Sequence, residues 1–168
     1  MSFSHKLMSN NFIKSDFKDV KKLLSKNNPI LTQHTNVKKF EQLWSKWLGV
    51  KYSIFVNSGS SANFLSIAAL KYINKKPHKK EIILPAFTWI SDIVSVIKNG
   101  YKPIFVDIDP KNLCMDLSQV KNKISKNTLA IFITHAQGFN GFNKDILKTA
   151  KKKRILIIED VCESHGAK

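Results

Sequence analysis

The chain beyond Gly49 alternates between short apolar runs and longer amphipathic segments, and this alternation constrains the fold more than any other feature. The apolar runs have strand length and β-branched content, and they cover residues 52–57, 81–85, 103–107, 129–135 and 154–159. The segments between them have helical length and spacing, at 61–73, 90–98, 116–124 and 143–152. Strands that alternate with helices are joined by right-handed crossovers. We therefore predict an α/β fold with a mainly parallel sheet and helices on both faces.

The first fifty residues have a different pattern, which predicts two amphipathic helices. Residues 14–26 place apolar side chains at helical spacing and end at an Asn-Asn-Pro turn. Residues 36–48 keep one apolar face, and Gly49 is expected to end that helix. Trp44 and Trp47 lie on this face, and an aromatic stripe at helical spacing is typical of core packing, so we assign both rings to packing and not to a ligand site.

The net charge of +16 raises the question of nucleic-acid binding, because clustered basic residues neutralise phosphates. Arg154 is the single arginine among the 28 basic residues. Bidentate recognition of phosphates and base edges favours the guanidinium group, and the lysines are spread along the whole chain. We therefore expect solvated lysines and no nucleic-acid partner.

The sequence contains no recognisable targeting segment and no closely spaced pair of cysteines. No stretch approaches the roughly 20 apolar residues of a membrane-spanning helix, and residues 1–11 lack the apolar core of a signal peptide. Cys114 and Cys162 lie far apart with no C-x-x-C spacing, which indicates neither a disulfide framework nor a zinc site. We expect a cytoplasmic protein with no membrane partner and no metal.

The segment Asn57-Ser58-Gly59-Ser60-Ser61-Ala62-Asn63 joins a predicted strand to a predicted helix. Small residues let the backbone approach an anion, the first amides of the helix point at it, and serine hydroxyls add donors. The segment matches neither the dinucleotide-binding glycine pattern nor the Walker pattern. It is therefore either a phosphate-binding turn or a capped turn without a ligand.

Three further features follow predicted strands, and ligands of such sheets bind outside the carboxyl ends of the strands. Trp89 follows strand 81–85, where its ring either stacks on a planar ligand or packs on a neighbouring helix. Asp160 ends the last strand, and its carboxylate requires a partner: a protonated pyridine nitrogen, a helix N-terminus or a lysine. Thr134-His135 end the strand before, with no role assigned.

Four motifs in this order resemble the DegT/DnrJ/EryC1/StrS family, the sugar aminotransferases of fold type I. They are N-S-G-S-S-A-N, L-P-A-F-T-W, K-P-I-F-V-D-I-D-P and I-I-E-D-V-C-E-S-H-G-A. The resemblance runs from about Pro29 to the last residue. It implies pyridoxal 5'-phosphate as cofactor, a keto nucleotide-sugar as substrate, glutamate as amino donor, a homodimer, and a role in polysaccharide biosynthesis. It also implies an N-terminal helical arm over 1–35 and a partial cofactor-binding α/β domain over 36–168.

The resemblance assigns roles to six residues. It implies that the cofactor phosphate is bound by Gly59, Ser60 and Ser61. It implies further that Trp89 stacks on the pyridine ring and that Asp160 pairs with the ring nitrogen. Glu163 would face the phenolic oxygen of the ring, where family aminotransferases more often have Gln, and an ionised Glu cannot donate to that oxygen.

Glu163 makes the predicted reaction ambiguous, because it is similar to a subset of the family that removes a sugar hydroxyl. The leading hypothesis is an aminotransferase, and the alternatives are a nucleotide-sugar 3-dehydratase and a truncated product without catalytic activity. In the family the Schiff-base lysine, or the histidine that replaces it in dehydratases, lies after the H-G-A motif. We therefore expect that residue and the C-terminal small domain to lie outside these 168 residues, which would leave this chain inactive by itself.

Overall fold

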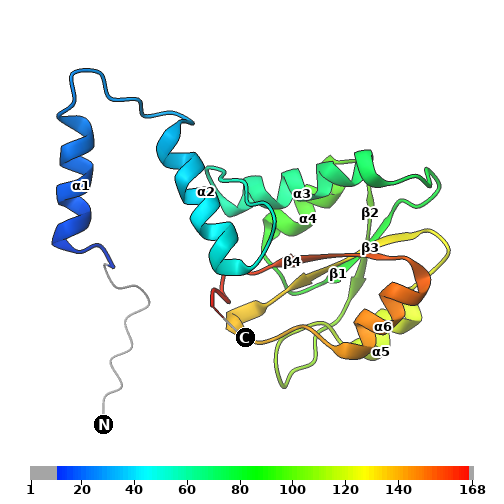
Figure 1. The fold of residues 1–168 in the computed structure, drawn as a ribbon. Coiled ribbons are helices and arrows are strands. Elements are labelled where there is room, and N and C mark those ends of the chain that lie inside the picture. The colour runs from blue at the N-terminus through cyan, green and yellow to red at the C-terminus, as the bar shows by residue number, and fades with distance from the viewer. Residues whose placement is uncertain (1–10, 167–168) are drawn as a thin grey trace, which may run out of the picture. The chain divides into compact units, whose positions relative to one another are not determined.

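The computed structural model describes residues 11–166, and its contacts divide the chain into two compact units, Met1–Phe55 and Val56–Lys168. Figure 1 shows helices in the first unit and alternating strands and helices in the second. The predicted α/β class is confirmed, and so is the change of pattern near residue 50. None of the described helices is long and apolar enough to cross a membrane.

The first unit contains α1 (Lys14–Leu24) and α2 (Thr35–Leu48). Gly49 ends α2 in the left-handed conformation, with φ of 72°, which glycine adopts without steric cost. The ring of Phe40 lies 5.7 Å from that of Trp44 and 5.4 Å from that of Phe55. Neither helix has a buried residue. The apolar face of α2 is therefore an aromatic cluster at the surface of its unit and not a core.

The predicted strand at 52–57 is wrong: this segment is extended but belongs to no sheet. Its backbone is bound by two side chains of the same unit: the amide of Phe55 donates to Oε1 of Glu41 at 2.8 Å, and its carbonyl accepts from Nε2 of Gln33 at 3.4 Å. Residues of this composition form a strand when a neighbour accepts their hydrogen bonds, and the described part of the chain has no such neighbour for them. The apolar pattern thus predicted the extended backbone of this segment correctly, but it did not show that the segment lacks a strand to pair with.

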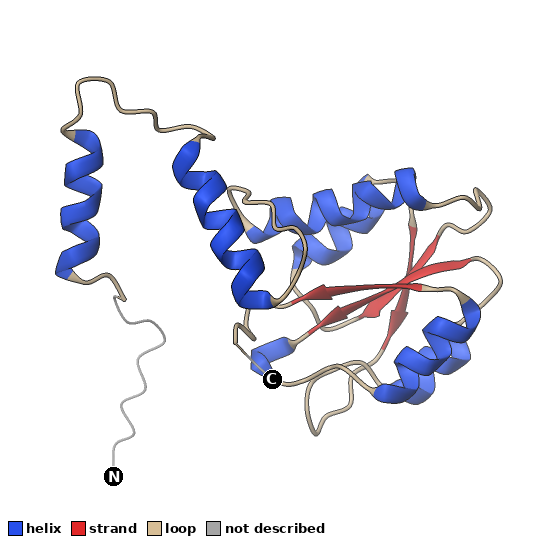
Figure 2. Ribbon diagram, in the orientation of Figure 1, coloured by secondary structure: helices blue, strands red, loops and turns tan. Residues whose placement is uncertain are grey.

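The second unit is built on a four-stranded sheet of β1 (Glu81–Pro85), β2 (Lys102–Val106), β3 (Thr128–Thr134) and β4 (Leu156–Asp160). The strand order is β2-β1-β3-β4, and every pair is parallel. Figure 2 shows the four strands running side by side with helices above and below. Parallel strands end at one edge of the sheet, so the polar residues that follow them are brought together.

Two helices cover each face of the sheet: α3 (Gly59–Ile73) and α4 (Ile90–Lys98) on one side, α5 (Leu117–Lys123) and α6 (Lys144–Lys153) on the other. Strand residues alternate between the two cores. Ala130 and Phe132 pack in the core beneath α3 and α4, whereas Ile131 and Ile133 pack in the core beside α5 and α6. All four side chains of β3 are fully buried, as expected for the inner strand of a parallel sheet.

The remaining predicted elements agree with the structure to within two residues at each end. The largest differences, of two residues, lie at the end of α1 and at the starts of α3 and β4. Helix α3 begins at Gly59, two residues early, because Ser58 caps it. Strand β4 begins at Leu156, two residues late, because Arg154 takes the left-handed conformation that ends α6. A short 3-10 helix at Ala136–Gly138 was not predicted.

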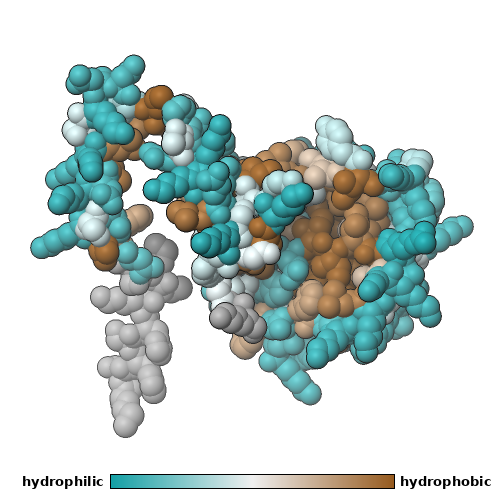
Figure 3. Space-filling view, in the orientation of Figure 1, coloured by the Kyte–Doolittle hydropathy of each residue, from teal (hydrophilic) through white to brown (hydrophobic). Residues whose placement is uncertain are grey.

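Large hydrophobic side chains remain exposed on the α/β unit, and Figure 3 shows them as a continuous apolar region framed by hydrophilic residues. The exposed apolar residues of α3, α4 and β4 include Phe64, Leu65, Ile73, Ile90, Val94, Ile97 and Leu156. Strands β2 and β4 form the two edges of the sheet. Exposed apolar regions of this kind are typical of surfaces that pack against another protein surface.

Candidate functional site

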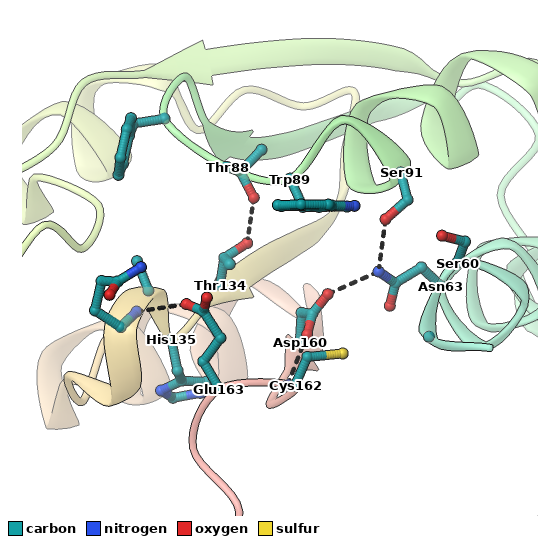
Figure 4. Close-up of a pocket in the computed structure, with 14 residues that line it drawn as sticks. Ser60, Asn63, Thr88, Trp89, Ser91, Thr134, His135, Asp160, Cys162 and Glu163 are labelled. Atoms are coloured by element: carbon teal, nitrogen blue, oxygen red, sulfur yellow. Dashed lines mark hydrogen bonds between the residues drawn. The ribbon is translucent and has the colours of Figure 1, made fainter. Parts of the chain in front are cut away.

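A cavity of about 590 Å³ lies at the carboxyl ends of the strands of the second unit. The start of α3 and the segments after β1, β3 and β4 line it (Figure 4). This volume lies within the range of small-molecule and cofactor sites. Five of the six predicted site residues line the cavity, namely Gly59, Ser60, Trp89, Asp160 and Glu163. The topology therefore brings together residues as far apart in the sequence as Gly59 and Glu163.

The sixth predicted residue, Ser61, is not among the residues that line the cavity. Its amide donates to Oγ of Ser58 at 3.1 Å, and its hydroxyl accepts from the same Oγ at 3.1 Å. Ser58 thus caps α3 and engages Ser61. The amides of Gly59 and Ser60 have no hydrogen-bond partner among the described residues, so they are the ones that remain available at the start of α3.

Gly59 is required by a close approach between α3 and the segment after β4. A Cβ atom at this position would lie 2.9 Å from Sγ of Cys162, closer than real Cβ contacts. The absence of a side chain lets the first turn of α3 approach Asp160 and its neighbours. The first turn of α3 and the end of β4 therefore line the cavity next to each other.

Trp89 occupies the N-cap position of α4, directly before its first turn. Its side chain is 70% exposed, and its ring lies across the cavity from Asp160 (Figure 4). A large aromatic ring that lines a cavity while remaining exposed has a free face for a planar ligand. This arrangement matches the predicted position of a stacking ring.

Asp160 is the last residue of β4, and its carboxylate is buried. Oδ2 accepts from Nδ2 of Asn63 at 2.7 Å, and Oδ1 accepts from the amide of Cys162 at 2.9 Å. Burial acts to raise the pKa of Asp160, but the hydrogen bonds from Asn63 and Cys162 outweigh it and hold the pKa below its ordinary value. Asp160 is thus an anion fixed by hydrogen bonds, and no described lysine or arginine forms an ion pair with it.

Sequence reasoning missed a buried polar cluster next to Asp160. Asp92 of α4 is completely buried, and its Oδ1 accepts from Nδ2 of Asn63 at 2.7 Å. Its Oδ2 lies within hydrogen-bonding distance of the hydroxyls of Thr88 and, at 2.9 Å, of Thr134. Burial is the main cause that raises the pKa of Asp92, and the charge of Asp160 adds to it. A polar residue on the apolar face of a predicted helix was the signal that could have found Asp92.

His135 and Glu163 line the cavity beside these groups. Nδ1 of His135 accepts from the amide of Gly141 at 3.2 Å, so its hydrogen is on Nε2, which lies 3.0 Å from Oε2 of Glu159. Oε2 of Glu163 accepts from the amide of Gln137 at 2.5 Å. Both side chains are therefore held by the turn that follows β3. Among the described residues, no group of three or more His, Cys, Asp or Glu side chains could bind a metal ion.

Cys162 also lines the cavity. Burial, followed by a hydrogen bond to Asp160 and the charges of nearby carboxylates, raises the pKa of its thiol to about 11. The thiol is therefore neutral at physiological pH and is a poor nucleophile. Cys162 therefore contributes to this site by its contacts with Gly59 and Asp160.

A parallel α/β sheet with a helix N-terminus, an aromatic ring and a buried anion around one cavity defines a cofactor-binding enzyme domain. Comparison with known proteins is consistent with that class. The model of the DegT/DnrJ/EryC1/StrS aminotransferase family matches residues 11–168, and the chain belongs to this family. The predicted family, its dependence on pyridoxal phosphate and the fold type are thereby confirmed.

Individual relatives include two kinds of enzyme. GDP-4-keto-6-deoxy-D-mannose 3-dehydratase of Yersinia pseudotuberculosis is 35% identical over 164 residues, which cover 96% of this chain and 41% of the relative. GDP-perosamine synthase of Escherichia coli O157:H7 is 31% identical over 132 residues, or 79% of this chain and 35% of the relative.

A solved structure of GDP-4-keto-6-deoxymannose-3-dehydratase, with a trapped PLP-glutamate geminal diamine, has a TM-score of 0.88 and 34% identity. It matches 98% of this chain and 43% of that chain. This chain therefore spans less than half of the length of these relatives.

Proposed function

We propose that this cavity binds pyridoxal phosphate and that the complete protein uses it to remove the 3-hydroxyl of a keto nucleotide-sugar. The observation that carries the cofactor assignment is Asp160: a buried carboxylate at the cavity wall, held as an anion by Asn63 and Cys162, with no cation from the described chain. Such an anion needs a cationic ligand, and a protonated pyridine nitrogen supplies one.

The other lining residues fit the remaining parts of the cofactor. The free amides of Gly59 and Ser60 at the start of α3 would bind the phosphate, with the hydroxyl of Ser60 as a further donor. The ring of Trp89 would stack on the pyridine. Ser61 contributes by accepting the hydrogen bond of Ser58 and so fixing the first turn of α3. Of the three residues that the sequence assigned to the phosphate, we thus propose that only Gly59 and Ser60 contact it.

When it is bound, pyridoxal phosphate supplies an electron sink for reactions at the carbon next to an attached nitrogen. Asp160 would keep the proton on the ring nitrogen, which strengthens that sink. Glu163 has one carboxylate oxygen engaged by Gln137, and as an ion it accepts hydrogen bonds and cannot donate them. A contact between Glu163 and the phenolic oxygen therefore requires a proton on one of the two groups.

Two observations support dehydration as the reaction. Relatives named GDP-4-keto-6-deoxy-D-mannose 3-dehydratase are 34–35% identical over 96–98% of this chain. GDP-perosamine synthases are 31–32% identical and match 77–79% of it. In addition, Glu163 stands where the resemblance places Gln in family aminotransferases. We infer a sugar with a keto group next to the carbon that loses its hydroxyl.

Amine transfer is the second candidate, and the likeness to GDP-perosamine synthases favours it. In either reaction we propose glutamate as the amino donor, a homodimer as the assembly, and the cytoplasm as the location. The exposed apolar residues of α3 and α4 support further protein contacts, since such surfaces are rarely left to solvent. The Schiff-base lysine of an aminotransferase, or the histidine in its place in a dehydratase, and the small domain would be supplied from beyond the matched part of the relatives.

The deciding experiment uses the full-length protein with pyridoxal phosphate, glutamate and GDP-4-keto-6-deoxy-D-mannose. Dehydration yields a sugar that has lost one hydroxyl oxygen and keeps its keto group; the two electrons come from glutamate, which leaves as 2-oxoglutarate and ammonia. Transfer instead replaces the keto oxygen with an amine, and glutamate again leaves as 2-oxoglutarate. Mass spectrometry of the nucleotide-sugar distinguishes the two products. A protein that shows no cofactor absorbance after reconstitution, and converts neither the GDP-linked nor a dTDP-linked keto sugar, would exclude the proposal.

A further inference from the structure

Asp92 is a buried acidic residue for which the proposed function provides no role. It lies on the inner face of α4, where its side chain is shielded from solvent by α3 and the ends of β3 and β4. Its two oxygens face different partners. Oδ1 is bound by the amide of Asn63, and Oδ2 lies against the hydroxyls of Thr88 and Thr134.

The number of hydrogens around Oδ2 identifies the protonation state of Asp92. Oδ2 of Asp92, Oγ1 of Thr88 and Oγ1 of Thr134 are all within hydrogen-bonding distance of one another, and the two threonine hydroxyls are 2.7 Å apart. Three contacts between oxygens require three hydrogens, and the two hydroxyls supply two. The third contact is a hydrogen bond only when Asp92 carries a proton, which closes a ring of three donors and three acceptors.

The charged and titratable groups around Asp92 agree with this count. From the end of β4 it faces the anion of Asp160, and the carboxyl groups of Asp92, Asp160 and Glu163 all act on the neutral thiol of Cys162 in the next segment. The turn after β3 adds His135, whose Nδ1 accepts from the amide of Gly141. No lysine or arginine is among the residues that line the cavity. Two carboxylates in contact without a cation do not both ionise.

We propose that Asp92 is a neutral carboxylic acid in the folded protein and that it acts as a positioning residue for Asp160 through Asn63. The amide of Asn63 donates to both carboxyl groups at 2.7 Å, so its orientation is fixed by Asp92 at one end. With Asp92 neutral, the pair carries a single negative charge, and that charge rests on Asp160 at the cavity wall. The protonation of Asp92 stands on the geometry alone, whereas its effect on a cofactor rests on the proposed function.

The first test is carbon-13 NMR of aspartate carboxyl groups in the cofactor-free full-length protein, with Asp92→Asn used to assign the Asp92 signal. We expect the Asp92 carboxyl carbon at the position of a protonated acid at neutral pH, and the Asp160 carbon at the position of a carboxylate. A carboxylate signal for Asp92 at neutral pH would overturn the proposal. This measurement contains no cofactor, so its outcome is independent of the proposed function.

The second test compares Asp92→Asn with Asp92→Ala by titrating the apoprotein with pyridoxal phosphate. Asparagine reproduces a neutral acid, since its amide can donate to Thr88 while its oxygen accepts from Asn63. We expect affinity within about twofold of the wild type for Asp92→Asn and a loss of about tenfold for Asp92→Ala, which releases Asn63. Such a loss corresponds to the free energy of roughly one hydrogen bond to a charged group.

The pH dependence of cofactor absorbance separates a neutral Asp92 from an ionised one. Replacing a neutral acid with asparagine leaves the charge unchanged, so we expect the midpoint of Asp92→Asn to stay where the wild type has it. If Asp92 were an anion, its removal would lower the pKa of the ring nitrogen and move the midpoint to lower pH. Asp160→Asn is the control that must move it. If this control fails, the cofactor pairing is wrong, and the NMR result for Asp92 still stands.

Discussion

The two units of the chain use their apolar residues in opposite ways. Helices α1 and α2 have well-separated apolar faces, yet neither contains a buried residue, and Trp47 is 58% exposed. In the α/β unit, the consecutive residues Ala130 to Ile133 of β3 are all completely buried. An amphipathic helix offers one face and needs an opposing surface, whereas an inner strand is covered on both faces by the helices that connect it to its neighbours.

This difference indicates where the free energy of folding is concentrated. A helix with an uncovered apolar face gains little from burial, and short isolated helices are marginal in water. The α/β unit has two separate hydrophobic cores and holds all the residues that line the cavity. The stable part of the chain and its candidate site are therefore the same unit.

A matched pair of phenylalanines tests this comparison with the largest expected effect. Phe132→Ala removes a completely buried ring from the core beneath α3 and α4, and we expect a loss of about 3–5 kcal/mol in the free energy of unfolding. Phe17→Ala in α1 removes a ring that is 53% exposed and should cost less than about 1 kcal/mol. Chemical denaturation of both variants measures the difference. Equal losses would show that α1 has a partner surface in solution.

A matched pair of aspartates extends the comparison to ligand binding. Asp160→Asn removes the anion at the cavity wall, and we expect pyridoxal phosphate to bind about 10- to 150-fold more weakly, the equivalent of about 1.5–3 kcal/mol. Asp19→Asn removes an exposed carboxylate of α1 and should leave binding unchanged. Absorbance titrations of both variants provide the affinities. Undiminished binding by Asp160→Asn would contradict the assignment of the ring-nitrogen partner.

The close approach of α3 to the end of β4 can be tested by a double substitution. Gly59→Ala introduces a Cβ atom 2.9 Å from Sγ of Cys162, and overpacking of this kind costs about 1–3 kcal/mol. Cys162→Ala removes the sulfur, so the double variant should recover most of the loss. Thermal or chemical denaturation of the two single variants and the double variant checks this coupling. Additive losses would show that the contact does not limit position 59.

Helix caps are the smallest expected difference between the two units. The side chain of Asn143 caps α6 by accepting from the amide of Asp145 at 2.7 Å, and Asn143→Ala should cost about 1 kcal/mol. His34 occupies the N-cap position of α2 without a side-chain cap hydrogen bond, so His34→Ala should change stability by less than about 0.5 kcal/mol. Denaturant midpoints measure both losses of stability, provided that the dependence of the free energy of unfolding on denaturant concentration is unchanged. If His34→Ala lost more stability than Asn143→Ala, the expected difference between the helix caps of the two units would be contradicted.

Much of the fold could be predicted because it depends on local patterns. The four strands that form, and the helices between them, have the periods and breakers that determine them locally, and their ends agree to within two residues. The segment 52–57 has the same composition but forms no strand, since pairing depends on a neighbour and not on propensity. Trp44 and Trp47 were predicted to pack in a core for a similar reason, and only a covering surface could have placed them there.

The site shows the same division between local and tertiary information. Residues that follow strand ends, such as Ser60, Trp89 and Asp160, could be found because parallel strands end at one edge. Asn63 and Asp92 lie inside helical segments, where a polar residue on the apolar face signals burial but does not identify its partners. The hydrogen-bond partners of the Asn63 amide lie in α4 and at the end of β4, at separations of 28 to 97 residues.

The sequence by itself therefore determined the α/β class, the family and the edge of the sheet at which chemistry is placed. Only the tertiary structure decided that Ser61 is engaged by Ser58, and that Asp160 and Asp92 share one asparagine in a buried cluster. The physical reason is that the two kinds of information act over different distances along the chain. Periodicity and turn residues act over a few positions, whereas the charge state of a buried carboxyl group depends on every group that the fold brings within hydrogen-bonding distance of it.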